Sequence, residues 1–154
     1  MTPRSIAEEI KQTRPFRSRS QEAVVALLRT ANVLTRRVEA VCQSEGITHQ
    51  QYNVLRILRG AKAPLPTMEI AERLVEQAPG ITRHVNNLES RGMIKREQWA
   101  GDRRQVLCQI TPAGLRVLER LDAPMDALDD AFAGRLGDEQ LAAFIETLDL
   151  LRDP

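Results

Sequence analysis

The segment from residue 47 to residue 111 contains helix start and stop signals so closely spaced that it can form only short elements. Thr48 stands at the cap of a helix, and Gln51 follows three residues later, which is the spacing of a capping box. Gly60 ends this helix. Its apolar face is predicted to consist of Tyr52, Leu55 and Leu58.

A second short helix is expected after a turn marked by Pro64 and Pro66. Thr67 is placed to cap this helix, which stops before Gln77. The 3.6-residue period then predicts which side chains are buried. They are Met68, Ala71, Leu74 and Val75.

A third short helix is expected from Pro79, which suits the first helical turn, to Arg91. Gly92 supplies the left-handed position that commonly follows a helix end. Two short helices separated by so few residues are typical of a helix-turn-helix, in which the second helix of the pair enters the major groove of DNA.

Two short runs after this helix pair predict a β-hairpin. Residues 95–99 and 105–110 flank residues 100–103, where a Gly and an Asp supply the turn. Thr111 and Pro112 then begin the next helix as its cap and first-turn proline. Helix, helix-turn-helix, hairpin and helix follow one another as in a winged helix. The expected fold class is therefore mainly α with a small β-wing.

The third short helix has one polar side. At about 100° per residue, Ile81, Val85 and Leu88 fall on the same side, which must be buried. The opposite side carries Arg83, Asn86, Asn87 and Ser90, with Thr82 on its flank. Asn is a poor helix former, yet it can pair with adenine, as Arg can with guanine or phosphate. Taken alone, such a stripe is an ordinary solvated face, but in a helix-turn-helix it predicts contact with DNA.

Both ends of the chain are predicted to form long amphipathic helices, one from about Ser20 to Ser44 and two after residue 112. Pro124 should kink or split the second of the three. A single DNA-binding lobe cannot bury the apolar stripes, so we predict an obligate homodimer. The stripes are Val24, Leu27, Ala31, Leu34, Val38 and Val41; Leu118, Leu121, Met125, Leu128 and Phe132; and Leu141, Ile145, Leu148 and Leu151.

The net charge of +1 hides an asymmetry between the two parts of the chain. Residues 1–116 hold 19 Lys and Arg against 11 Asp and Glu, whereas residues 117–154 hold 3 against 10. A basic stretch attracts nucleic acid or an anionic membrane, and an acidic tail is most often a solvated helix face.

The sequence argues against several other classes of protein. Its longest apolar run is far below the roughly 20 residues needed to cross a bilayer, so a cytoplasmic protein without membrane contact is expected. The two cysteines and two histidines lack the spacing of a zinc site. No catalytic triad, phosphate loop or metalloprotease motif occurs, so we predict neither an enzyme nor a metal or other cofactor.

On these residues the sequence resembles the MarR family of bacterial transcriptional regulators, over residues 21–151. The strongest part is residues 102–104 followed by residues 110–114, which are similar to the family's wing signature. Residues 80–94 resemble the family's recognition helix and the turn after it, and residues 51–55 also fit.

The resemblance implies one MarR-like domain over residues 1–154. Its winged helix-turn-helix lobe would span residues 47–111, and residues 1–46 and 112–154 would form a helical dimerisation region. Such a homodimer binds a pseudo-palindromic operator in double-stranded DNA, with half-sites about one helical turn (~10 bp) apart. It is usually a repressor that is released by a small-molecule effector, here of unknown identity, or by an oxidant.

The resemblance also assigns roles to individual side chains. Arg103 and Arg104 in the wing would contact DNA, with Arg104 in the minor groove and held by a salt bridge from Asp102. Tyr52 and Arg56 would line the effector pocket between the dimer helices and the lobe, although Tyr52 equally suits the core.

Two alternatives stay open. The first is a winged-helix module that binds proteins instead of DNA, against which the outward Arg83 and the Asp102/Arg104 pair argue. The second is a thiol-based redox-responsive regulator. It would need a reactive cysteine, but Cys108 is expected to face inward and Cys42 lies near the end of the first long helix. We therefore predict that neither cysteine is the switch.

Overall fold

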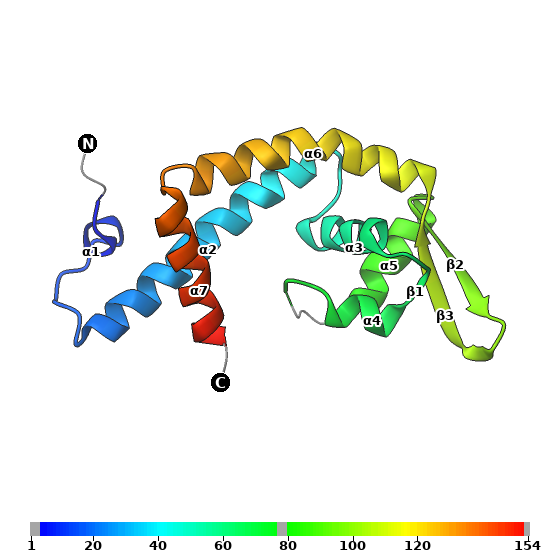
Figure 1. Cartoon of the computed structure of the whole chain (residues 1–154), viewed down its shortest axis with the longest axis horizontal. Helices are drawn as coiled ribbons and strands as arrows, with labels where there is room; N and C mark the ends of the chain where they lie inside the picture. Colours follow the sequence, from blue (N-terminus) through cyan, green and yellow to red (C-terminus); the bar gives the residue numbers. More distant parts are fainter. Residues whose placement is uncertain (1–3, 77–79, 153–154) are drawn as a thin grey trace. The chain divides into compact units, whose positions relative to one another are not determined.

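The computed structural model describes residues 4–76 and 80–152 (Figure 1). The chain forms two compact units, Met1–Arg37 and Val38–Pro154. Helices predominate in the described residues, and the strands form one small sheet, so the predicted mainly α fold class with a β-wing is confirmed. The elements are α1 (Ile6–Glu9), α2 (Arg19–Gln43), α3 (His49–Gly60), β1 (Leu65–Pro66), α4 (Thr67–Glu72), α5 (Ile81–Ser90), β2 (Ile94–Trp99), β3 (Asp102–Ile110), α6 (Pro112–Ala133) and α7 (Asp138–Arg152).

The first unit contains α1 and most of α2. The hydroxyl of Ser5 accepts a hydrogen bond from the N–H of Glu8, which caps α1. Glu9 in α1 forms an ion pair of 2.7 Å with Arg29 in α2. Residues Val24, Leu27 and Leu28 of α2 are exposed in the single chain. The helix therefore presents an apolar surface that this unit does not cover.

Capping fixes where the helices of the second unit begin and end. The hydroxyl of Thr48 accepts from the N–H of Gln51, whose side chain accepts from the N–H of Thr48, as predicted for the capping box of α3. Thr111 caps α6 by accepting from the N–H of Gly114. Gly92, just after α5, has a φ of 68°. Each side-chain cap pairs a backbone donor that the helix itself cannot, which contributes about 1 kcal/mol.

An aliphatic core holds α3, α4, α5, α6 and the sheet together. Burying each large side chain in it contributes roughly 1.5–3 kcal/mol. The predicted periodicity of α5 agrees with this core, because Val85 and Leu88 are completely buried. The largest fully buried side chains include Ile47, Leu55, Ile70, Leu88, Ile94, Leu118 and Leu121.

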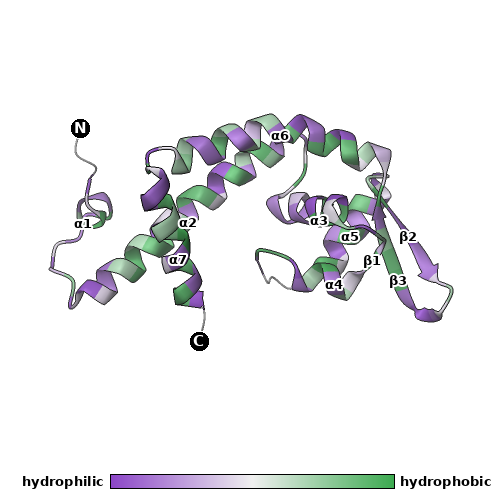
Figure 2. Ribbon diagram, in the orientation of Figure 1, coloured by the Kyte–Doolittle hydropathy of each residue, from purple (hydrophilic) through white to green (hydrophobic). Residues whose placement is uncertain are grey.

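The sheet is antiparallel with the strand order β1-β3-β2. β2 and β3 form the predicted hairpin, in which Ile94 pairs with Ile110 at its base. Figure 2 shows the start of β3 as hydrophilic and its later part as hydrophobic. β1 was not predicted; there Leu65 pairs with Cys108, and Pro66 completes the strand. A proline is tolerated in a strand at the edge of a sheet, where its missing N–H leaves no ladder bond unmade.

The prediction for α4 was wrong in its cap and in part of its buried side. Pro66 occupies the cap position, whereas Thr67 is the first helical residue. Ile70 is fully buried, and Met68 is 69% exposed because two residues along a helix turn the side chain by about 200°. Val75 is also exposed, since α4 ends before it. The predicted first-turn role of Pro79 lies outside the described residues.

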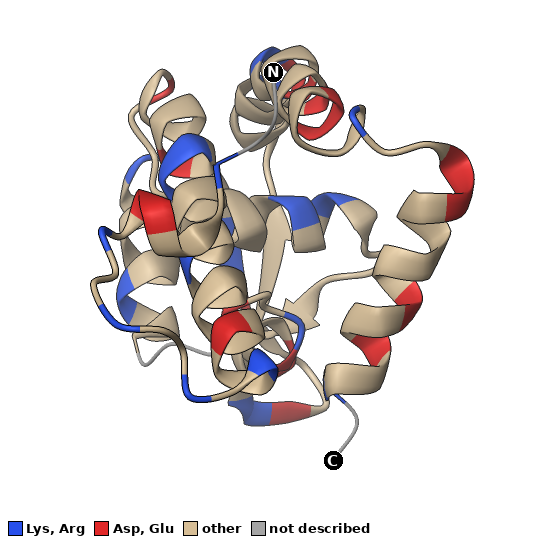
Figure 3. Cartoon of the chain, turned by 90° about the vertical axis from the view of Figure 1, so that its left-hand side faces the viewer, with Lys and Arg blue, Asp and Glu red and all other residues tan. Residues whose placement is uncertain are grey.

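The long C-terminal helices follow the predicted order, but α6 is not split. It runs without interruption from Pro112 to Ala133 with Pro124 inside it. Acidic residues recur along α7 (Figure 3), in line with the charge asymmetry of the sequence. No helix in the described part of the chain combines the length and the apolar character needed to cross a membrane.

Candidate nucleic-acid interface

The polar side of α5 is exposed along its whole length. The side chains predicted to contact DNA all lie at the surface: Thr82, Arg83, Asn86, Asn87 and Ser90. Gly80 precedes the helix with a φ of 113°, a conformation that L side chains rarely adopt. The helix begins directly after this glycine, and Arg83 in its first turn is exposed to solvent.

Three neighbouring elements hold α5 in place. Nε2 of Gln51 in α3 donates to Oδ1 of Asn87 at 2.7 Å. Arg91, directly after α5, donates through Nη1 to the carbonyl oxygen of Gly46 at 2.8 Å. On the hairpin side, Nε of Arg96 donates to Glu89 at 2.8 Å. These contacts fix the helix near its middle and at its end.

The loop between α2 and α3 is in turn fixed to α6. Nε of Arg120 donates to the Glu45 carboxylate at 2.8 Å, and these hydrogen bonds hold the pKa of Glu45 below its ordinary value. Glu89 has a lowered pKa for the same reason, because Arg96 binds it. Both carboxylates are therefore ionised at neutral pH.

A polar hollow of about 310 Å³ lies beside α5. Two of its side chains are cationic, which suits it to negatively charged groups such as phosphates. Burial, together with the nearby charge of Arg83, lowers the pKa of His84, so the imidazole in this hollow is neutral at pH 7. The lining residues are Gly46, Thr48, Gln51, Arg83, His84, Asn87 and Arg91.

The wing tip differs from the predicted arrangement. The carboxylate of Asp102 accepts a hydrogen bond from the backbone N–H of Arg104 at 3.0 Å. Among the described residues, neither Arg103 nor Arg104 makes a side-chain ion pair, so the predicted Asp102–Arg104 salt bridge is absent. A carboxylate two residues earlier reaches the main chain more easily than the guanidinium, and it therefore shapes the turn. Both arginine side chains are exposed.

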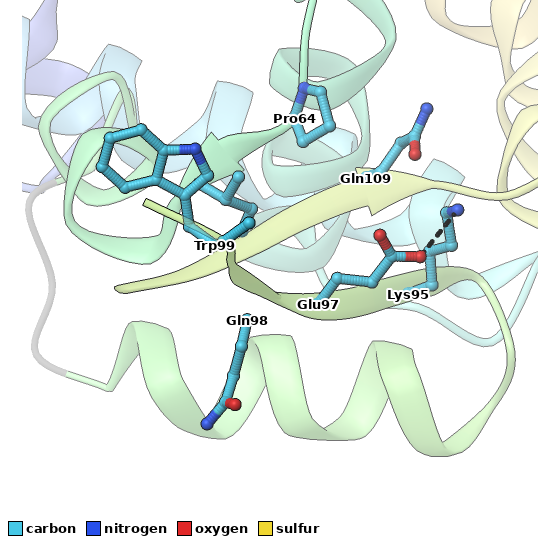
Figure 4. A pocket seen from close by; sticks show the side chains of 8 residues that line it. Pro64, Lys95, Glu97, Gln98, Trp99 and Gln109 are labelled. Carbon is cyan, nitrogen blue, oxygen red and sulfur yellow. Dashed lines mark hydrogen bonds and ion pairs between the residues drawn. The ribbon is translucent and has the colours of Figure 1, made fainter. Parts of the chain in front are cut away.

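A second hollow, of about 230 Å³, lies on the hairpin beside Pro64 (Figure 4). Its apolar wall includes Trp99, whose ring packs against Gly101 so closely that a Cβ there would lie 2.9 Å from it. Trp99 is 46% exposed. An ion pair of 3.1 Å between Lys95 and Glu97 crosses the rim.

The two residues predicted to line an effector pocket have different environments. Tyr52 is 8% exposed and belongs to the core, and burial raises the pKa of its hydroxyl. Arg56 is exposed on the same helix, with Nη2 at 3.4 Å from Oδ1 of Asn53. Their role towards an effector stays a prediction.

Both cysteines are completely buried. Burial, with the nearby charge of Glu39, raises the pKa of Cys42 to about 11. Burial also raises the pKa of Cys108, whose Sγ lies 3.6 Å from the hydroxyl of Thr67. No group of three or more potential metal ligands gathers within residues 4–76 and 80–152.

Comparison with known proteins identifies the family. The sequence model of the MarR family matches residues 47–106. A MarR transcription factor from Planctomyces limnophilus with a crystal structure is 33% identical, with a TM-score of 0.67 over 88% of this chain and 99% of that one. The chain belongs to the MarR family of transcriptional regulators.

Other relatives of this MarR-family chain are more distant. A regulatory protein named for the hcr operon of Thauera aromatica is 28% identical over 70% of this chain, which spans 64% of that relative, just under two thirds. Two Streptomyces coelicolor structures share the fold, each with a TM-score of 0.78. Sco3205 in complex with DNA is 22% identical and covers 91% of both chains. PcaV with its natural ligand is 23% identical and covers 91% of this chain and 98% of that one.

Proposed function

We propose that this MarR-family regulator is a homodimeric, sequence-specific DNA-binding repressor in the cytoplasm. The observation that carries the proposal is the exposed polar side of α5. The helix is held by contacts to α3, to the loop between α2 and α3, and to the hairpin. Thr82, Arg83, Asn86, Asn87 and Ser90 contact the major groove, and Arg103 and Arg104 approach the neighbouring minor groove. The DNA-bound Sco3205 structure, with the same fold, supports this geometry.

The dimerisation region comprises residues 1–46 and 112–154, and the DNA-binding lobe comprises residues 47–111. Exposed apolar side chains on α2 and α7 support this division, because water-exposed stripes of this size are normally covered by a partner. They include Val24, Leu28, Ile145, Leu150 and Leu151. The solution mass at micromolar concentration should be twice the 17.3 kDa chain mass; a folded monomer would contradict the dimer.

A small-molecule effector releases the repressor from DNA. The ligand-bound PcaV structure supports a ligand-responsive fold, and Tyr52 and Arg56 are the residues proposed to line the pocket. Binding of a candidate effector should weaken the affinity for DNA, which a titration against preformed complex would measure.

A gel-shift assay with the gene's own upstream DNA tests DNA binding. We expect a complex that survives an excess of random competitor DNA, and a footprint of two half-sites about one helical turn (~10 bp) apart. Arg83→Ala should weaken it, whereas Arg135→Ala, an exposed arginine between α6 and α7, serves as the matched control. Binding no tighter to upstream DNA than to random DNA would instead favour the protein-interaction module.

A further inference from the structure

Gln51 is a buried polar side chain whose two ends are both engaged. It lies in the first turn of α3 and is 6% exposed. Its Oε1 accepts from the backbone N–H of Thr48 at 3.0 Å, and its Nε2 donates to Oδ1 of Asn87 in α5 at 2.7 Å. The capping box of one helix is thus joined to the exposed side of the next.

The direction of these hydrogen bonds is set by chemistry. A backbone N–H can only donate, so the group that Gln51 turns towards Thr48 must be its oxygen. The Gln51 amide nitrogen then faces Asn87, which must accept with its own oxygen. Reversing Gln51 would leave the partly buried N–H of Thr48 facing another donor, and a donor left unpaired away from water is unfavourable.

The remaining hydrogen-bonding group of Asn87 is its Nδ2 amide. Within the described part of the chain, Nδ2 donates to no protein acceptor, and the residue is exposed. The neighbouring Asn86 is also exposed, and neither end of its amide has a protein partner among the described residues. The two adjacent asparagines therefore differ: neither end of the Asn86 amide is engaged by a described residue, whereas the Asn87 oxygen already accepts from Gln51 and is oriented by it.

We infer that Gln51 determines base specificity from a distance, by fixing Asn87 as a hydrogen-bond donor in the major groove. This inference rests on the proposed DNA-binding function. One of the two lone pairs of Asn87 Oδ1 accepts from Gln51, whereas both protons of Nδ2 are left for a contact with DNA. We expect the base that Asn87 contacts through Nδ2 to offer an acceptor, which guanine, thymine and adenine do and cytosine does not.

Gln51→Glu is the variant that reverses this arrangement. A glutamate at this position keeps the capping box, because its carboxylate still accepts from Thr48. Its second oxygen can only accept, so Asn87 must turn its amide nitrogen inward and expose its oxygen. The contacted base must then offer a donor, as cytosine and adenine do, and guanine and thymine become unfavourable.

Selection from a randomised double-stranded DNA library measures the change. The full-length wild type and Gln51→Glu are compared, each also in an Asn87→Ala background. At one position per half-site we expect the guanine-to-cytosine ratio to reverse, by about twofold to tenfold for one hydrogen bond. Asn87→Ala should abolish the reversal. Asn86→Ala is the matched control, in which the reversal should persist while a different position loses its preference.

Nuclear magnetic resonance of the free protein tests the hydrogen bond between Gln51 and Asn87 without DNA. In Gln51→Glu the side-chain amide protons of Asn87 should exchange with water more slowly than in the wild type, because they now donate to a carboxylate. An unchanged exchange rate would overturn the inference that Gln51 orients Asn87. Identical base preferences of the wild type and Gln51→Glu would overturn it too, as would a reversal that persists in the Asn87→Ala background. A wild type that selects no sequence at all, with the exchange difference present, would overturn the proposed function and leave the Gln51–Asn87 contact standing.

Discussion

Helix α5, which we propose enters the major groove, and the wing tip both present arginines to solvent, but the two elements are supported differently. Along α5, Asn87 is bound by Gln51, and Arg91 at its end is bound to Gly46. At the wing tip, the main-chain N–H of Arg104 donates to the carboxylate of Asp102, and Asp102 pairs with Trp99 across the hairpin. Helix α5 is thus held by side-chain contacts to neighbouring elements, whereas the wing tip is shaped by a hydrogen bond within its own turn.

We expect this difference to give α5 and the wing different roles in binding DNA. A side chain ordered only on binding loses about 0.5–1.5 kcal/mol in rotamer freedom, and a preorganised one loses less. Fixed groups on α5 suit the reading of base edges, which depends on direction. The exposed arginines of the wing suit the electrostatic attraction of the minor groove, which depends on charge and groove width.

The largest effect, a loss of folding stability, is expected at Gly114, which packs against both the segment after α5 and the base of the hairpin. A Cβ at Gly114 in α6 would overlap the carbonyl oxygen of Met93 and lie 2.8 Å from Ile110 at the base of the hairpin. Gly114→Ala should lower the free energy of unfolding by about 3 kcal/mol. Gly60→Ala is the control, because a Cβ there meets nothing within 4 Å. Denaturant unfolding checks both variants, and equal midpoints would contradict the close contact.

The next largest effect, on DNA affinity, compares an arginine of α5 with an arginine of the wing. Arg83→Ala and Arg104→Ala should each weaken operator binding by about 1–3 kcal/mol without unfolding the protein. If Arg83 contacts a base edge in the major groove, its loss should relax the preference at one base position. Loss of Arg104 should weaken all sequences alike and reduce the salt dependence by about one phosphate contact. Affinities for operator and random DNA at several salt concentrations measure this. If both variants lose base preference, or both weaken all sequences alike, α5 and the wing do not differ in how they bind DNA.

A smaller effect tests what Asp102 does at the wing tip. If its hydrogen bond to the backbone N–H of Arg104 shapes the turn, Asp102→Asn keeps an accepting oxygen and should bind operator nearly as well as the wild type. Asp102→Ala removes the acceptor and should lose about 0.5–1.5 kcal/mol. Equal losses in both variants would instead support the salt bridge between Asp102 and the Arg104 side chain that the family resemblance implied.

The sequence predicted well what depends on neighbouring residues. The caps at Thr48 and Thr111 and the left-handed Gly92 follow from local rules of hydrogen bonding and backbone sterics. The periodicity of α5 was sufficient to separate its buried and exposed sides. The family resemblance rested on these same local motifs, which is why it was correct.

Contacts between distant residues were not predictable in this way. Gln51 and Asn87 are 36 residues apart, and no local pattern pairs them. The buried side of α4 was misassigned because a helix of only six residues has too few positions to define its phase, so Met68 was chosen over Ile70. β1 consists of two residues that include a proline, and only its partner strand reveals it.

The smallest effect is expected at the cysteines, which belong to neither region. A pKa of about 11 leaves roughly one Cys42 thiol in 10⁴ ionised at pH 7, and only the thiolate reacts with peroxide. Cys108 is equally buried and its pKa is raised as well. Replacing both by Ala should leave DNA affinity and its response to peroxide unchanged. An oxidant response that disappears in the double variant would make a thiol the switch after all.

The raised pKa of Cys42 also predicts how stability changes with pH. Folding favours the protonated thiol, so its contribution is fully present below the pKa of the unfolded thiol, about 8.5, and is lost as the pH rises towards about 11. The free energy of unfolding of the wild type should therefore fall over this range more steeply than that of Cys42→Ala, measured by denaturant titrations at a series of pH values. Parallel curves would mean that the thiol ionises as easily in the folded chain as in the unfolded one, and the argument against a redox role for Cys42 would lose its physical basis.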